Sequence, residues 1–401
     1  MKRFGIYVHI PYCLQICTYC DFVKFESRDL PPSKDYVALL QRELATRSMA
    51  FGSRELTSIY FGGGTPSLFS PEEILAVIDG IANEGFSLKS GGEVTLEVNP
   101  GTINETALAR FLEIGVTRFS VGAQTFDESL LALTGRKHAV SDTMATLEML
   151  KKHKVNYSFD LLFGLPGQRL NGVKTDVAKA LEFEPSHLSA YNLTVPIKHP
   201  LNVGRASDDE QAEMFEAIEA DLEAGGLLRY EVSNFAKPGF ESEHNRLYWS
   251  DDAYWGLGVG AHSYIPRGDT AAVDAEAPWG IRFWNPATIN SYAQELERAA
   301  GALFWSALKE DRIEKLKANE ALTDFCHTAL RSQQGLSIKK IEIKFGVKTA
   351  ALLRSRLAAS NLAPFLTMPS DDLWVLSRKG QAMADRVFEA LTFLKDDGIE
   401  V

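Results

Sequence analysis

The amino-acid sequence predicts an α/β fold: a six-unit partial (β/α) barrel, a small mixed region, and a helical, winged-helix-like C-terminal domain. Three observations predict this organisation. Six short β-rich runs alternate with stretches of helical spacing, and such alternation produces parallel strands joined by right-handed crossovers. Six units are too few for a closed eight-unit barrel. The pattern of residue types changes near residue 228 and again near residue 300. We therefore expect structural units at 1–227, 228–300 and 301–401.

The β-rich runs are short, as expected for strands buried on both faces. They lie at residues 4–9, 56–61, 93–98, 118–121, 155–163 and 187–195. Ligands of parallel α/β folds gather at the carboxyl ends of the strands. The residues that follow each run are therefore the first place to look for a binding site.

The stretches between the runs carry helix signals. Tyr36, Leu40 and Leu44 recur on one side of the first predicted helix. Ser70 followed three residues later by Glu73 is typical of a capping box at the start of the second. Further helices are expected after Asn104, Asp142, Asn171 and Asp208.

The C-terminal part has a different residue pattern. Residues 337–358 predict two short helices on either side of Phe345-Gly346, residues 362–366 and 373–376 a small hairpin, and residues 379–394 a final helix. This order resembles a winged helix. A lid or interaction module is favoured over DNA binding, because the sequence pI is about 5.3.

Charge and hydropathy exclude several partners. Lys and Arg number 42 and Asp and Glu 53, so the net charge is −11. That balance argues against nucleic acid and anionic membranes as partners. No apolar run approaches the roughly 20 residues of a transmembrane helix, and the apolar stretch after Arg3 is too short for a signal peptide. A cytoplasmic location is expected.

Three of the four cysteines, Cys13, Cys17 and Cys20, lie within eight residues directly after the first predicted strand. A tight cluster in a long chain poor in cysteine indicates a metal rather than disulfides. Three thiolates can hold three irons of a [4Fe-4S] cluster and leave the fourth iron open. Zinc is the alternative, with His9 or Cys13 completing the Cys17-x-x-Cys20 pair. Cys326 lies in a predicted helix and is expected to be inert.

The spacing Cys-x3-Cys-x2-Cys, with Tyr19 before the last cysteine, resembles the radical S-adenosylmethionine (SAM) superfamily. The resemblance implies that Cys13, Cys17 and Cys20 hold a [4Fe-4S] cluster at the mouth of a six-unit partial barrel. The open iron chelates SAM, and an electron from the cluster cleaves it to a 5′-deoxyadenosyl radical. An external electron donor is implied if SAM is cleaved.

Polar or glycine-rich residues follow each of the next strands. They begin with Gly62-Gly63-Gly64-Thr65-Pro66, where consecutive glycines let the backbone approach a ligand closely. The resemblance assigns Arg136 to the SAM carboxylate, which a guanidinium can bind with two hydrogen bonds. It assigns the following residues to SAM: Tyr7, Tyr19, Gly63, Gly64, Thr65, Glu97, Gln124, Arg136 and Asp160. One departure is the run 193–196, Leu-Thr-Val-Pro, where members often carry an acidic residue.

The whole chain resembles the oxygen-independent coproporphyrinogen III oxidase-like subgroup. Three details favour its heme-chaperone branch over the oxidase. Phe22 stands where the oxidase has a further cysteine, and only twelve residues precede Cys13. The run His244-Asn245-Arg246-Leu247-Tyr248-Trp249 matches the His-Asn-x-x-Tyr-Trp signature of that branch.

Heme iron takes an imidazole ligand, and aromatic residues cover porphyrin faces. The resemblance therefore implies that His244 ligates heme and that Tyr248 and Trp249 pack beside it; His262 is a weaker candidate. The expected function is a heme chaperone that carries a [4Fe-4S] cluster and SAM and delivers heme to an acceptor protein. The alternatives are an oxygen-independent coproporphyrinogen III oxidase, another radical tetrapyrrole enzyme, or a zinc-structured binding module.

Overall fold

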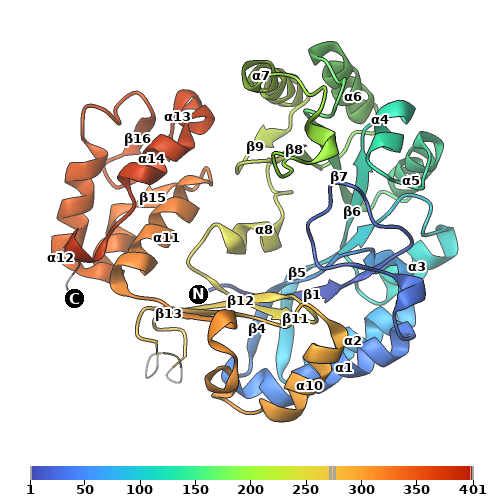
Figure 1. Cartoon of the computed structure of the whole chain (residues 1–401), viewed down its shortest axis with the longest axis horizontal. Coiled ribbons are helices and arrows are strands. Elements are labelled where there is room, and N and C mark those ends of the chain that lie inside the picture. Colours follow the sequence, from blue (N-terminus) through green and yellow to red (C-terminus); the bar gives the residue numbers. More distant parts are fainter. Residues whose placement is uncertain (1, 271–272, 274–276, 398, 400–401) are drawn as a thin grey trace.

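The computed structural model describes residues 2–270, 273, 277–397 and 399. Twelve strands of this part of the chain form one open, curved sheet, in the order β14-β13-β12-β11-β1-β4-β5-β6-β7-β8-β10-β9. Helices cover its convex side. The C-terminal helices form a separate group at the other side of the molecule (Figure 1). The predicted α/β class, with a partial barrel and a helical C-terminal domain, is confirmed.

The six predicted strands form the centre of the sheet, and each pairs with its neighbour in parallel. They are β1 (Phe4–Ile10), β4 (Arg54–Gly63), β5 (Phe86–Val98), β6 (Arg118–Gln124), β7 (Asn156–Phe163) and β8 (His187–Asn192). The last strand ends three residues before the predicted end. After Asn192 the chain leaves the ladder and becomes a loop that contains Pro196, which has no N–H to donate.

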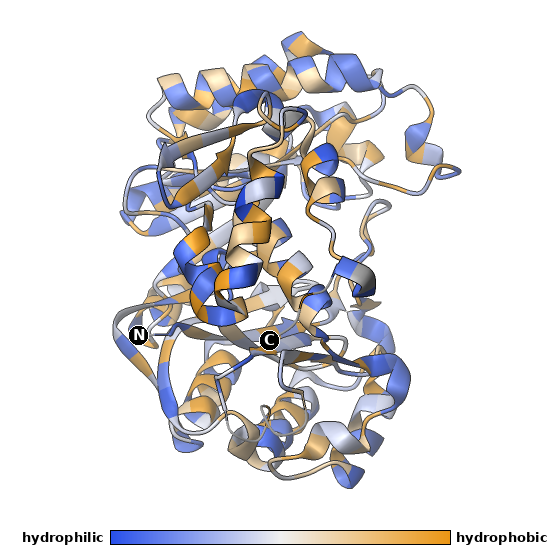
Figure 2. Ribbon diagram, turned by 90° about the vertical axis from the view of Figure 1, so that its left-hand side faces the viewer, coloured by the Kyte–Doolittle hydropathy of each residue, from blue (hydrophilic) through white to orange (hydrophobic). Residues whose placement is uncertain are grey.

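The predicted helices join these strands and lie on the convex face. They are α1 (Ser33–Arg47), α2 (Pro71–Asn83), α3 (Glu105–Glu113), α5 (Val140–Lys152), α6 (Leu170–Glu182) and α7 (Asp208–Ala224), with the short α4 (Glu128–Leu133) before α5. The capping box of Ser70 and Glu73 is formed at the start of α2. Helix α5 begins two residues before Asp142, whose carboxylate accepts from the Ala139 amide instead. Figure 2 shows hydrophilic and hydrophobic residues alternating along the helices of the molecule.

Successive side chains along each central strand point to opposite faces of the sheet. On β1, Ile6 and Val8 are fully buried in the core under the helices. The residues between them point to the concave face, where the Tyr7 hydroxyl lies 3.0 Å from His9 Nδ1 and the Tyr7 ring stacks on Tyr60 of β4. The concave face therefore carries the polar and aromatic groups from which a site can be built.

The region after α7 extends the same sheet on both edges. Strands β9 (Leu228–Arg229) and β10 (Asn234–Ala236) join β8, and β11 (Ala253–Leu257) pairs in parallel with β1. Antiparallel β12 (His262–Pro266), β13 (Gly280–Trp284) and β14 (Ile313–Lys315) follow. Between these groups, helix α8 (Glu243–Tyr248) lies on the concave side (Figure 1).

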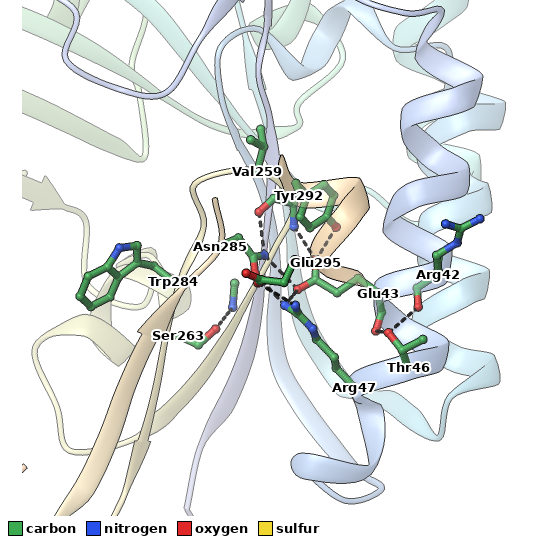
Figure 3. A network of polar contacts seen from close by, with 12 residues as sticks. Arg42, Glu43, Thr46, Arg47, Val259, Ser263, Trp284, Asn285, Tyr292 and Glu295 are labelled. Atoms are coloured by element: carbon green, nitrogen blue, oxygen red, sulfur yellow. Dashed lines mark hydrogen bonds and ion pairs between the residues drawn. The ribbon is translucent and has the colours of Figure 1, made fainter. Parts of the chain in front are cut away.

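A buried polar network fixes this extension to the barrel (Figure 3). Glu43 and Arg47 of α1 have fully buried side chains and form an ion pair at 2.9 Å. Arg47 also donates to Asn285 and pairs with Glu295 of α10 (Ile289–Arg298), while Glu43 accepts from the Tyr292 hydroxyl at 2.5 Å. The network joins segments about 240 residues apart in sequence, so the extension and the barrel form one packed unit.

The C-terminal residues form a separate core. Its elements are α11 (Ala318–Leu330), β15 (Leu336–Ser337), α12 (Ile338–Leu357), β16 (Leu366–Ser370), β17 (Leu373–Leu376), α13 (Arg378–Ala382) and α14 (Ala384–Ala390). Gly346 has φ +86° and breaks α12 where two helices were predicted. The hairpin starts later than predicted, at Leu366. The final helix is interrupted at Met383, whose φ −126° and ψ 36° are not helical.

None of the helices in the described part of the chain is both long enough and apolar enough to span a bilayer.

Candidate cofactor and heme sites

A cavity of about 410 Å³ opens at the carboxyl ends of the central strands. Its volume lies within the range of small-molecule sites. All six central strands, or the loops that follow them, contribute to its wall. The last contribution comes from residues 191–192 at the end of β8 and residues 193–194 after it. The side chains of Cys13, Cys17 and Cys20 all face this cavity. The sequence therefore placed the cysteine cluster correctly at the mouth of the barrel.

The cysteine loop is tied to the neighbouring strand ends. Cys13 belongs to the short strand β2 (Tyr12–Cys13), which pairs with β3 (Phe25–Glu26). The Thr18 amide donates to Thr134 O at 3.0 Å, and the Gln15 side chain donates to Gly135 O at 2.8 Å. These contacts hold the loop against the segment that carries Arg136.

All four cysteines are free thiols. Burial raises the pKa of Cys13 to about 11, and burial also raises the pKa of Cys20. Iron and zinc both bind the thiolate, so binding a metal here must release protons. Among the described residues, no three His, Cys, Asp or Glu side chains surround a point where a single metal ion would sit.

The glycine run lets β4 end close to the cysteine loop. Gly63 has φ +114°, and its amide donates to Glu97 Oε2 at 3.1 Å. A Cβ atom on Gly64 would lie 2.9 Å from Cys13 Sγ and 2.8 Å from Tyr12 O. A side chain at Gly64 would therefore push the cysteine loop out of place.

Arg136 crosses the wall of the cavity with its guanidinium buried. Its Nη1 donates to Asn99 Oδ1 at 2.6 Å and its Nη2 to the Tyr19 hydroxyl at 3.0 Å, while its Nε is buried without a partner. Asn99 in turn donates to Thr65 at 3.0 Å. A fixed cation with an unsatisfied donor fits a carboxylate ligand, because Arg binds carboxylates with paired hydrogen bonds.

Two carboxylates face the same cavity. The pKa of Glu97 is raised to about 7, chiefly by burial and also by nearby Asp160, although the hydrogen bond from the Tyr60 hydroxyl lowers it. Burial also raises the pKa of Asp160. Gln124 lies between them on β6 with φ +69°, a conformation that costs a non-glycine residue about 1 kcal/mol. Such a strained residue in a cavity wall is typical of a binding site.

The structure thus brings together eight of the nine residues that the resemblance assigns to SAM. They are Tyr19, Gly63, Gly64, Thr65, Glu97, Gln124, Arg136 and Asp160. Tyr7 does not line the cavity and lies deeper on the concave face. Asn99 was not singled out from the sequence, and its bonds to Arg136 and Thr65 could not be inferred without the fold. Leu193 and Thr194, in the run that lacks the family's acidic residue, also line the wall.

His244, the candidate heme ligand, lies on α8 and is 1% exposed. Its Nδ1 is 2.8 Å from the Ser58 hydroxyl, and its Nε2 is 3.0 Å from the Tyr248 hydroxyl. Its ring stacks on Tyr60, and burial lowers the pKa of His244 to about 3. The imidazole is therefore neutral at physiological pH. Both nitrogens have partners, so iron could reach Nε2 only after Tyr248 moves.

The start of α8 is fixed by a carboxylate from the sheet. Glu93 of β5 accepts from the amides of Glu243 and His244 at 3.1 and 3.2 Å. A negative charge at a helix N-terminus is favourable. This contact holds α8 across the concave face, below the cavity that the cysteines line.

The remaining heme candidates, Trp249 and His262, contact other parts of the chain. Trp249 ends α8 and faces the C-terminal domain, where the Arg331 guanidinium lies 5.7 Å from its ring centroid. His262 is exposed and stacks on Trp284 at 5.2 Å. The structure therefore keeps His244 and Tyr248 in contact on α8 and places His262 at the start of β12, stacked on Trp284 of β13.

Comparison with known proteins agrees with this geometry. Residues 7–179 match the Radical SAM superfamily. A partial barrel with three cysteines at its carboxyl-end cavity defines the chain as a radical SAM protein. It is 32% identical to the heme chaperone HemW of Bacillus subtilis, over 96% of this chain and 98% of that protein. The HemW of Escherichia coli is 35% identical over 65% of this chain and 70% of that protein. The chain belongs to the HemW family.

One solved structure covers nearly the whole chain. Coproporphyrinogen III oxidase (HemN) from Escherichia coli, a radical SAM enzyme, superposes with a TM-score of 0.79 over 98% of this chain and 90% of that chain. The identity is 20%. At that identity the likeness shows a shared fold and nothing about the reaction.

Proposed function

We propose that this protein is a heme chaperone: it binds heme, carries a [4Fe-4S] cluster and SAM in the barrel, and passes heme to an acceptor protein. The observation that carries the proposal is the position of the His-Asn-x-x-Tyr-Trp segment. It covers all but the first residue of α8 and the Trp249 that ends it, on the concave side of the sheet, and His244 stacks on the same Tyr60 that bonds to Glu97 in the cavity wall. Membership of the HemW family supports it.

The cavity residues divide into three tasks. Cys13, Cys17 and Cys20 would hold the cluster, which when bound supplies the electron that cleaves SAM. Arg136, fixed by Tyr19 and Asn99, would bind the carboxylate of SAM. Glu97, Gln124 and Asp160 would accept or donate hydrogen bonds at the ribose, in a wall that burial keeps dry.

Heme binding by His244 would require a rearrangement of α8. In the structure the Tyr248 hydroxyl is hydrogen-bonded to Nε2 of His244, and Ser58 is bonded to the other ring nitrogen. We propose that this arrangement is the heme-free state, in which Tyr248 protects the ligand until heme displaces it. If only a fraction of the molecules has Nε2 exposed at any moment, the apparent affinity for heme is reduced by that fraction.

The alternative function is radical decarboxylation of coproporphyrinogen III. The fold shared with the oxidase is compatible with it. Against it stands Phe22, at the position where the family resemblance implies a further cysteine in the oxidase. Both functions involve a tetrapyrrole, so the two are separated only by measuring binding and turnover on the same sample.

The experiment is anaerobic reconstitution with iron and sulfide, followed by iron analysis, heme titration and coproporphyrinogen turnover on one preparation. We expect about four irons per chain, saturable heme binding and no porphyrin product. Cys17→Ala should lose the cluster, whereas Cys326→Ala, buried in the C-terminal core, should keep it. Porphyrin formation would favour the oxidase, and stoichiometric zinc with no iron uptake would favour the zinc-structured module.

A further inference from the structure

A second cavity, of about 500 Å³, lies between the barrel and the C-terminal domain. One wall is the segment after α8, residues 249–252, together with Lys2 and Arg3 at the start of the chain. The other wall is formed by α11 and α12 of the C-terminal domain. Trp249, the last residue of the His-Asn-x-x-Tyr-Trp segment, faces this cavity, whereas His244 and Tyr248 do not line it.

The cavity is cationic although the chain as a whole carries a charge of −11. Its charged residues are Lys2, Arg3, Arg267, Lys340, Lys344, Asp251 and Asp252. This set has a surplus of three positive charges. A cleft lined by positive charges attracts negatively charged ligands, even where the protein as a whole is negative.

The two acidic residues are already paired. Asp252 binds Arg3 at 2.9 Å, and Asp251 binds Lys344 at 2.5 Å. Among the described residues, Lys2, Arg267 and Lys340 form no ion pair with a carboxylate. Lys2 donates to a backbone carbonyl, and Arg267 lies over the Trp279 ring at 4.2 Å. Within the part of the chain that the structure describes, no carboxylate neutralises these three cations, although Arg267 also donates to Lys344 O at 3.5 Å.

Apolar groups line the same cavity beside the cations. Trp249 and Phe325 are partly exposed, and Ile343 of α12 is 77% exposed. An aromatic and aliphatic wall next to unpaired cations fits a flat, largely apolar ligand whose edge bears carboxylates.

We infer that this cavity binds the carboxylate edge of a porphyrin, with Lys340, Lys2 and Arg267 at the two propionates and Trp249 against the ring. The inference rests on the proposed function, since it takes heme as the ligand, and it assigns the contacts that select heme by its charge. These contacts are independent of the iron ligand. They link the C-terminal domain to binding, because Lys340 and Ile343 both belong to α12.

The test is charge reversal at one lysine with a neighbour as control. Lys340 and Lys339 are both exposed on the first turn of α12, but only Lys340 lines the cavity. Neither lysine side chain forms a hydrogen bond or ion pair within the described residues, although the charge of Lys339 contributes to lowering the pKa of Asp372. We expect Lys340→Glu to weaken heme binding at least fivefold in anaerobically reconstituted full-length protein, because a like charge then faces the propionates. Lys339→Glu should stay within twofold of the wild type.

The dimethyl ester of heme, which lacks free carboxylates, supplies the second arm. We expect the wild type to bind the ester at least fivefold more weakly than heme, and Lys340→Glu to bind the ester as the wild type does. Equal heme affinity of the two lysine variants, or equal affinity of the wild type for heme and its ester, would overturn this inference and leave the proposed function standing. A wild type that binds no heme would overturn both.

Discussion

The ring of Tyr60 stacks on the imidazole of His244, with centroids 5.1 Å apart and planes inclined by 27°. The hydroxyl of the same tyrosine donates to Glu97 Oε1 at 2.8 Å. One side chain therefore touches both the wall of the cysteine cavity and the segment proposed to bind heme. The two sites are separate, yet a change at one can reach the other through a single buried ring.

The hydroxyl of Tyr60 affects the charge of Glu97. Its hydrogen bond lowers the pKa of Glu97, which burial raises to about 7. Tyr60→Phe should therefore raise that pKa further, and SAM binding should weaken at pH 7 and recover only at higher pH. Calorimetric titration of SAM across pH 6 to 9 measures this. Tyr7→Phe is the control, because its hydroxyl bonds to His9 and not to Glu97; an identical pH profile for both variants would contradict the assignment.

Glu97 also makes stability depend on pH. Its folded pKa of about 7 is above the ordinary 4.5, so its contribution to stability is complete below pH 4.5 and is lost as the pH rises through 7. Glu97→Gln should match the wild type at pH 5 and exceed it at pH 8, by ~3 kcal/mol at most. Urea unfolding of cluster-free protein at both pH values tests this. The exposed Glu55→Gln should show no such difference.

Tyr248 protects the Nε2 atom of His244 through a 3.0 Å hydrogen bond. Tyr248→Phe keeps the ring but removes this bond, which is worth about 1 kcal/mol. If His244 is the ligand, heme affinity should rise about fivefold. Tyr254→Phe removes a hydroxyl from the ring that packs against Tyr248 and should have no comparable effect. Unchanged or weaker heme binding in Tyr248→Phe would mean that heme does not compete for this nitrogen.

The network of Glu43 and Arg47 holds the extension against the barrel (Figure 3). Arg47→Met would leave the Glu43 carboxylate buried without its cation, whereas Glu295 would keep its ion pair with Arg312. We therefore expect a loss of about 3–5 kcal/mol in unfolding free energy. Arg42→Met is the matched control, since Arg42 is half exposed and its ion pair with Glu297 is 3.7 Å long. Equal urea midpoints for the two variants would show that the network does not stabilise the fold.

The sequence was sufficient to predict the central strands and the position of the cysteines at their carboxyl ends. Parallel strands give short apolar runs, and the residues after each run converge because all six strands end at the same edge. Cys13 and Arg136 therefore could be placed in one cavity from their positions after strands.

Other features depend on contacts between distant segments. The partner of His244 Nδ1 is Ser58, 186 residues away, so its enclosure could not be read from the His-Asn-x-x-Tyr-Trp segment. Asn99 was missed because its role is to position Arg136. Tyr7 lies away from the cavity because its side chain points to the concave face one layer below the strand ends. The second cavity exists only because the C-terminal domain packs beside Trp249.

The most direct test of the account is heme titration of anaerobically reconstituted wild type and His244→Gln, with iron content measured on the same samples. Glutamine keeps a hydrogen-bonding side chain next to Ser58 but removes the imidazole. We predict an intact cluster in both proteins, saturable heme binding in the wild type and greatly reduced binding in His244→Gln. An unchanged heme titration in the variant would contradict the assignment of His244 as the heme ligand.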